Sequence, residues 1–171
     1  MTQTRTDQAA REKVWELIRD IEVATMVTLD SQGQMRGRPM RAVELKEFEG
    51  TLWFFTSGGS PKAEEIRQDE RVLLAYAEPS DQNYVSISGT AQVIRDVAQQ
   101  KAMWSEPLRL WFPNGPEDPA AALLKVEVEG AEYWDAPSST LLLAYGYVKA
   151  RLTGEPPKAG ENDKVAFKRP A

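Results

Sequence analysis

The sequence predicts a mainly β (α+β) fold, a small antiparallel barrel with helices at its start and between its strands. Segments rich in Val, Ile, Leu and aromatic residues dominate the chain, and short turn sequences join most of them. An alternating parallel fold fits worse, because parallel neighbours require long crossover connections, usually helices. With 171 residues and no internal repeat, the chain has the length of one domain, which we expect over residues 1–154.

The first expected element is a helix over about residues 7–21. Apolar residues recur at helical spacing from Ala10 to Ile21, and Thr6 and Asp7 are available to cap the start. Three strands joined by short turns follow, and we expect them to form a meander. They are predicted over residues 23–30, 35–45 and 51–57.

The second half of the chain predicts further strands around a long loop. Its elements are a helix at 61–70, strands at 71–79 and 83–96, a helix capped by Asp96, and strands at 122–135 and 139–154. The Pro- and Gly-rich loop at 105–119 holds three large apolar residues, Leu110, Trp111 and Phe112, and a loop of this kind usually folds over something. The composition of residues 155–171 predicts a poorly ordered tail.

The composition excludes several classes of function. Cysteine and histidine are both absent, which rules out disulfides, thiolate nucleophiles, metal sites of the Cys/His type and histidine-based catalytic triads. The formal net charge of −5 argues against nucleic acid or an anionic membrane as the main partner. No apolar run reaches the length of a membrane span and no signal peptide is visible, so we expect a cytoplasmic protein.

One stretch, TSGGSPKAEEI from Thr56 to Ile66, has the residues of an anion site. It combines hydroxyls, two glycines and Lys62 at the start of a predicted helix, where free backbone N–H groups and the helix dipole favour a phosphate. The alternative is a simple loop and helix cap, which is the more frequent meaning of such a turn. The stretch is not a P-loop, because GxxxxGK[ST] is absent.

Six motifs along the chain carry a resemblance to a known family. In order they are RGRPMRAVEL, GTLWFFTSGGSPKAEEI, VLLAY, YVSISGTAQVIRD, LWFPNGPEDP and AEYWD. Their order and spacing resemble the general stress protein branch of the pyridoxamine 5′-phosphate oxidase-like flavoproteins, from the first helix to about Gly154. The resemblance implies an FMN-binding split β-barrel, a homodimer, and FMN bound in a cleft between the subunits.

The resemblance also implies which residues hold the flavin phosphate. Arg41 falls in the family's arginine strand, and Phe55 and Thr56 match an aromatic-Thr pair. Ser60, Pro61 and Lys62 match a Ser-Arg-Lys triplet of the oxidases, so this chain has lost one cation there. We therefore expect FMN to bind, with FAD as a weaker alternative.

The arginine strand leaves two interpretations open. Arg36 and Arg38 share one face by alternation and Arg41 the other, unless Pro39 marks a bulge that lets Met40 and Arg41 face the flavin. Solvated surface arginines are the alternative, which we favour for Arg36.

Three tryptophans are also candidates for the site. Trp134 matches a tryptophan that approaches the flavin from the second subunit in the oxidases, and its alternative is a core or interface aromatic. Trp111, with Phe112, is expected to cover the isoalloxazine or to pack the dimer, and Trp104 to lie in the core.

The expected activity differs from that of the oxidases. Their segment after the tryptophan carries Arg and His for the substrate phosphate, whereas DAPSSTLLLAYGY here has neither. Oxidation of pyridoxamine phosphate is therefore not expected, and no catalytic residue is assigned. Three classes of function remain: a flavin-dependent oxidoreductase on an unknown small molecule, a non-catalytic flavin-binding protein for storage or sensing in stress, and a barrel that has lost its ligand.

Overall fold

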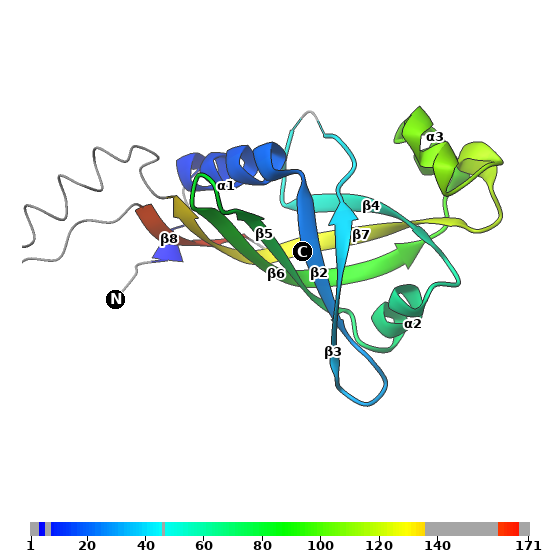
Figure 1. The fold of residues 1–171 in the computed structure, drawn as a ribbon, viewed down its shortest axis with the longest axis horizontal. Helices are drawn as coiled ribbons and strands as arrows, with labels where there is room; N and C mark the ends of the chain where they lie inside the picture. Colours follow the sequence, from blue (N-terminus) through cyan, green and yellow to red (C-terminus); the bar gives the residue numbers. More distant parts are fainter. Residues whose placement is uncertain (1–3, 6–7, 46, 136–160, 168–171) are drawn as a thin grey trace, which may run out of the picture.

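The structure, a computed structural model, describes residues 4–5, 8–45, 47–135 and 161–167. Eight strands form one mainly antiparallel sheet in the order β1-β8-β7-β6-β5-β2-β3, and β4 pairs with β7 off this path (Figure 1). The strands are β1 (Thr4–Arg5), β2 (Val23–Leu29), β3 (Met35–Arg41), β4 (Thr51–Ser57), β5 (Arg71–Glu78), β6 (Asn83–Ile94), β7 (Ala121–Asp135) and β8 (Glu161–Ala166). Only β1 and β8 run parallel among the described pairs. The predicted antiparallel, mainly β fold is confirmed, and the described strands do not close into a ring.

The expected three-strand meander is wrong in its last member. β2 and β3 form a hairpin, but β4 pairs along its whole length with β7, from Thr51 opposite Glu127 to Ser57 opposite Ala121. The connection between β3 and β4 is nine residues long, well beyond a tight hairpin turn. Its length therefore does not force the two strands to pair with each other. Among the described residues here, one backbone bond, from the Val43 N–H to the Trp53 carbonyl at 2.7 Å, links the two segments.

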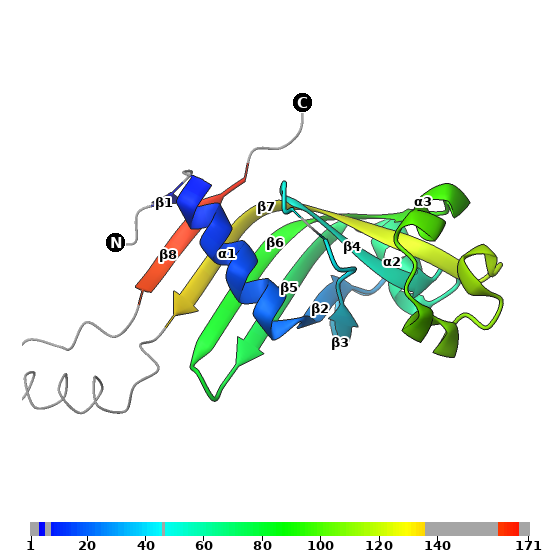
Figure 2. The same cartoon turned by 90° about the horizontal axis from the view of Figure 1, so that it is seen from above.

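The first helix, α1 (Gln8–Ile21), forms where the sequence predicts it, and it covers one face of the sheet. It contacts β5, β6 and β8, and Figure 2 shows it lying across them. Its buried residues are Ala10, Val14, Leu17 and Ile18, which recur every three or four positions and so form one apolar stripe. They join a core built mainly from alternate side chains of the strands.

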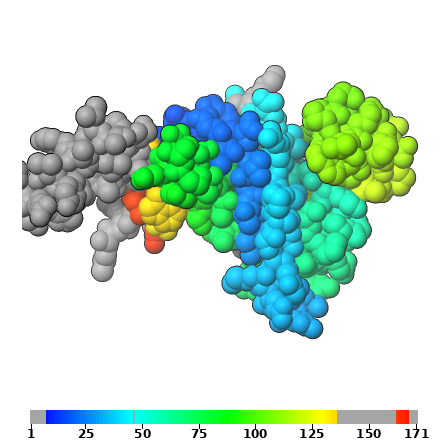
Figure 3. Space-filling view, viewed as in Figure 1, coloured from blue at the N-terminus to red at the C-terminus, as the bar shows by residue number. Residues whose placement is uncertain are grey.

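Four further helical segments follow among the described residues. They are α2 (Pro61–Gln68), α3 (Val97–Ala102) and two short 3₁₀ turns, η1 (Glu106–Leu110) and η2 (Gly115–Glu117). The Asp96 side chain accepts a hydrogen bond from the Gln99 N–H at 3.1 Å, so the predicted cap of α3 is confirmed. α3 and the turns after it form a lobe at one end of the molecule, seen as the yellow-green atoms of Figure 3.

Part of the predicted tail is a strand. Glu161–Ala166 pairs antiparallel with the end of β7, and Val165 and Phe167 are buried. These two residues alternate with the exposed Lys164 and the half-buried Ala166, so the segment has an apolar face, and β7 supplies the backbone partners. Composition averages over such a short alternating pattern, so it did not predict this strand. The strand predicted at 139–154 lies outside the described residues.

A bulge between Ser88 and Gly89 shifts the register of β6 against β7. A Cβ on Gly89 would lie 2.2 Å from the Glu127 carbonyl oxygen, a distance no side chain tolerates. Gly89 is therefore required for the two longest strands to approach each other. Among the described residues, no helix has the length and hydropathy to cross a bilayer.

Candidate functional site

The predicted anion-binding stretch forms the junction between β4 and α2. Ser60 caps the helix, since its side chain accepts from the Ala63 N–H at 3.4 Å, and Pro61 occupies the first helical turn. The expected strand-turn-helix order is thus confirmed. Pro61 has no N–H and the Ala63 N–H bonds to Ser60, so the Lys62 N–H is the first-turn donor left toward the preceding turn.

Two glycines form the turn, Gly58 and Gly59, and neither has a positive φ. The turn therefore does not need glycine for its backbone conformation. A Cβ on Gly59 would meet nothing within 4 Å, so open space lies beside this residue. The absence of a side chain keeps that space accessible next to the helix start.

Two hydroxyls line the same junction. Thr56 is 3% exposed, and its Oγ1 lies 3.4 Å from the Ser60 Oγ. Thr56 faces inward with Leu52 and Phe54, because alternate residues of β4 share a face. The end of β4 and the start of α2 therefore place two adjacent hydroxyl donors together.

Arg38 reaches this junction from β3. Its Nη2 lies 2.7 Å from the Glu65 Oε2 on α2, and its Nη1 donates to the Thr28 Oγ1 on β2. The Thr28 hydroxyl in turn donates to the same Glu65 oxygen at 2.5 Å. A closed network of three side chains from three elements thus fixes the guanidinium.

Lys62 lies beside this network. Its pKa is lowered from the usual 10.5, first by burial of the ammonium and then by the positive charge of Arg38, while Glu65 acts in the opposite direction. Such coupling means that the two cations are close enough to repel each other. Burial and this neighbouring positive charge both disfavour the charged form of Lys62, and an anion bound nearby would favour it.

We refer to these residues together as the α2 cluster: Thr28, Arg38, Thr56, Ser60, Lys62 and Glu65. It offers two cations, hydroxyl donors and a helix start, the chemistry that binds a phosphate group. Within the described ranges, no group of three or more acidic residues gathers as a metal site. Sequence reasoning missed Thr28 and Glu65, although Glu65 is three residues from Lys62 and so shares its face of the helix.

Arg41 does not join the α2 cluster within one chain. The register of β2 against β3 runs through Pro39 without a shift, so the hypothesis of a bulge there is wrong. Arg41 consequently lies on the other face from Arg38, is 67% exposed and pairs with Glu22 at 2.8 Å. Arg36 is a solvated arginine as expected, paired with Asp30 at 3.0 Å, and Met40 is buried in the core.

Phe55 points away from the α2 cluster toward the lobe around α3. Its ring meets Trp104 edge to face, with centroids 5.6 Å apart, and lies 6.2 Å from the ring of Phe112. Phe112 is buried, whereas Leu110 and Trp111 are exposed. The predicted apolar loop therefore folds over Phe55 through Phe112 and leaves Trp111 at the surface.

Trp134 lies far from Lys62 in the same chain. Ala122 pairs with Thr56, and Trp134 follows it along β7 by 134 − 122 = 12 residues. At roughly 3.3 Å per residue the separation along the strand is about 40 Å. Thr56 of the α2 cluster and Trp134 therefore lie at opposite ends of β7.

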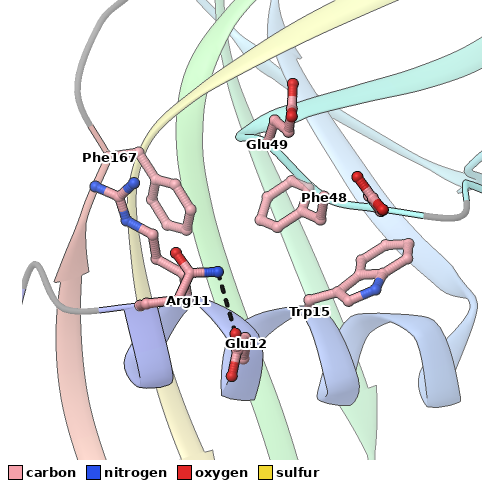
Figure 4. A pocket seen from close by; sticks show the side chains of 8 residues that line it. Arg11, Glu12, Trp15, Phe48, Glu49 and Phe167 are labelled. Atoms are coloured by element: carbon pink, nitrogen blue, oxygen red, sulfur yellow. Dashed lines mark hydrogen bonds between the residues drawn. The ribbon is translucent and has the colours of Figure 1, made fainter.

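A hollow of about 460 Å³ lies elsewhere, between α1, the β3–β4 connection and the end of β8. It is lined by Gln8, Arg11, Glu12, Trp15, Glu47, Phe48, Glu49 and Phe167. Figure 4 shows its aromatic rings directed at one another: Trp15 stacks on Phe48 at 5.5 Å, and Phe48 meets the edge of Phe167. Arg11 lies over Phe167, 5.1 Å from the ring centroid, so the ring faces serve to pack α1 against the sheet.

Comparisons with known proteins agree on the fold. The family described as "Pyridoxamine 5′-phosphate oxidase like" matches residues 9–158. A solved structure from Jannaschia sp. CCS1, assigned provisionally as general stress protein 26, is 24% identical with a TM-score of 0.75, over 94% of this chain and 100% of that one.

Two further relatives extend these likenesses. The general stress FMN/FAD binding protein of Xanthomonas citri is 28% identical with a TM-score of 0.67, over 78% of this chain and 93% of that one. The protein bli-3 of Neurospora crassa is 24% identical over 140 residues, 77% of this chain and 67% of its own. The fold and the match over most of the chain show that this protein belongs to the pyridoxamine 5′-phosphate oxidase-like family.

Proposed function

We propose that this protein is a flavoprotein that binds FMN and serves as a flavin-dependent oxidoreductase on a small molecule. The observation that carries the proposal is that Glu65 holds the Arg38 guanidinium from β3 against α2, the helix that bears Lys62, in a chain of this family. A similar protein is described as FMN/FAD binding, which supports a flavin as the ligand. The net charge of the chain is −5, so this pair of cations does not follow from a generally basic surface.

The α2 cluster fits the phosphate of FMN. Arg38 contributes N–H donors in a fixed fork, Lys62 contributes an ammonium, and Ser60 and Thr56 contribute hydroxyls. Thr28 and Glu65 hold the guanidinium in place before any ligand arrives, which lowers the entropic cost of binding. When bound, the isoalloxazine of the flavin supplies hydride or electron transfer.

The site is completed by a second copy of the chain in this proposal. Trp134 and Trp111 are large aromatic side chains left exposed in the described structure, and Trp134 is about 40 Å along β7 from the α2 cluster. A homodimer buries them and brings Trp134 of one copy toward the cluster of the other. Arg41, exposed on the opposite face of β3, has no phosphate role here.

Two cations and the helix start favour FMN over FAD. The terminal phosphate of FMN is close to a dianion, whereas the corresponding phosphate of FAD is a singly charged diester. A non-catalytic role in flavin storage or sensing is the second candidate, favoured by the absence of histidine from the chain. Pyridoxamine phosphate oxidation is not proposed, because the stretch from Asp135 to Tyr147 has neither Arg nor His.

Absorption spectroscopy with FMN titration tests the proposal. We expect a flavin spectrum from the purified protein, or saturable binding of FMN to the apo-protein. Reduction of the bound flavin by NADH or NADPH supports the enzyme, and binding without reduction supports the storage or sensing role. Protein that is colourless and ignores added FMN and riboflavin contradicts both.

A further inference from the structure

Glu65 is the acidic member of the α2 cluster, and it lies where an anionic ligand is expected to bind. Its Oε2 accepts from the Thr28 hydroxyl at 2.5 Å and from the Arg38 Nη2 at 2.7 Å. The Glu65 side chain is 12% exposed and that of Arg38 is 21% exposed. Water therefore screens this pair only weakly, and its charge is felt by neighbouring groups.

The adjacent residue on the same helix shows what a carboxylate does there without this burial. Glu64 pairs with Arg67 at 3.3 Å, and their side chains are 62% and 46% exposed. An exposed pair of this kind contributes little to stability or to the local potential. The two glutamates thus carry the same charge on the same helix, but Glu65 is largely buried and Glu64 is exposed.

Glu65 sets the net charge of the α2 cluster. Arg38 and Lys62 contribute +2 and Glu65 contributes −1, which leaves +1. The FMN monoester carries close to two negative charges on one phosphate at neutral pH, whereas the pyrophosphate of FAD carries one on each of its two phosphates. The phosphate that meets the cluster therefore exceeds the cluster's charge of +1 in FMN and equals it in FAD.

We propose that Glu65 is a specificity-determining residue, which positions Arg38 and reduces the preference of the site for FMN over FAD. The inference rests on the flavin site proposed above. Arg38 retains N–H donors beyond the two that bind Thr28 and Glu65. The network therefore orients the guanidinium and leaves donors for a ligand. The carboxylate acts on the phosphate through charge, and on Arg38 through hydrogen bonds.

Glu65→Gln tests the charge, since the amide oxygen retains an acceptor for Arg38. Dissociation constants for FMN, FAD and riboflavin are measured at fixed salt for the wild type, Glu65→Gln and the matched control Glu64→Gln. We expect Glu65→Gln to bind FMN about tenfold more tightly and FAD about threefold, with riboflavin changed by less than about twofold. Glu64→Gln is expected to change none of the three by more than about twofold.

Thr28→Val tests the positioning independently, because it removes the shared hydroxyl without altering charge. We expect FMN to bind about threefold more weakly and riboflavin to bind as before. This variant still tests the positioning of Arg38 if melting shows that Glu65→Gln does not fold. An unchanged FMN constant in Thr28→Val overturns the positioning role.

An FMN-to-FAD ratio that Glu65→Gln leaves unchanged, or an equal gain for riboflavin, overturns the role in specificity. If the wild type binds no flavin, the proposed function fails, and pyrophosphate then serves as the probe of the cluster. Tighter pyrophosphate binding by Glu65→Gln than by the wild type still supports the effect of charge, whereas equal or weaker binding overturns it.

Discussion

The Glu65 Oε2 lies 2.7 Å from the Arg38 Nη2, so the helix that carries Lys62 also holds the arginine that reaches it from β3. This contact distinguishes Arg38 from Arg41, which lies three residues further along the same strand and makes no such contact with α2 in the described structure. Arg38 is directed into the α2 cluster, and Arg41 is directed toward Glu22 on the other face.

Arg38→Gln is expected to weaken FMN binding about ten- to hundredfold, because a charge-assisted hydrogen bond contributes about 1.5–3 kcal/mol. Arg41→Gln is the matched control on the opposite face of β3, and we expect less than about a twofold change. Titration of each apo-protein with FMN measures both. The assignment is reversed if Arg41→Gln shows the larger loss.

Lys62→Ala is expected to weaken FMN binding by a similar ten- to hundredfold while the protein stays folded, since the lysine neutralises part of the phosphate charge. Lys101→Ala removes a lysine that is 53% exposed and paired with Glu117 on the lobe, and should leave binding unchanged. FMN titration and a thermal melt of both variants give the comparison. Equal constants for Lys62→Ala and the wild type would make Lys62 a surface lysine.

The FMN affinity is expected to fall as the pH rises toward 10.5. Binding requires the charged ammonium of Lys62, and burial together with Arg38 lowers its pKa from 10.5, so the charge is lost at a lower pH than in an exposed lysine. In Lys62→Arg this fall should disappear, because arginine stays protonated. Riboflavin titrated over the same range corrects for ionisation of the flavin ring, and the same fall for FMN in Lys62→Arg contradicts the assignment.

Sedimentation is expected to show a species of about twice the mass of one chain at micromolar concentration. In a shared site, FMN binding depends on the dimer, so the apparent affinity should decrease when the protein is diluted below its dimer dissociation constant. Trp134→Ala should weaken FMN binding in the dimer, because it removes the aromatic ring of the second copy. A monomer that binds FMN with the same constant at every dilution rules out the shared site.

Gly89→Ala is expected to destabilise the fold by about 1–3 kcal/mol or more, because its Cβ would lie 2.2 Å from the Glu127 carbonyl oxygen. Gly59→Ala is the control, since its Cβ would meet nothing within 4 Å and its φ is not positive. Denaturant unfolding measures both. A Gly89→Ala protein as stable as the wild type would show that β6 and β7 can separate at the bulge.

The sequence by itself determined the local elements and the family. The periodicity of α1, the cap at Asp96 and the strand-turn-helix junction at Ser60 were all predicted, because each depends on interactions between residues close in the chain. The order of six motifs identified the family, because that order can be read from the sequence alone.

The pairing of strands and the partners of Arg38 were decided only by the tertiary structure. β4 forms its backbone hydrogen bonds with β7, although β3 is its neighbour in the chain. Glu161–Ala166 forms β8 because β7 supplies its hydrogen-bond partners, which its composition did not indicate. Alternation placed Arg38 and Arg41 on opposite faces but left open which face meets α2. The contact of Arg38 with Thr28 and Glu65 joins three elements, and no local pattern encodes where separate elements meet.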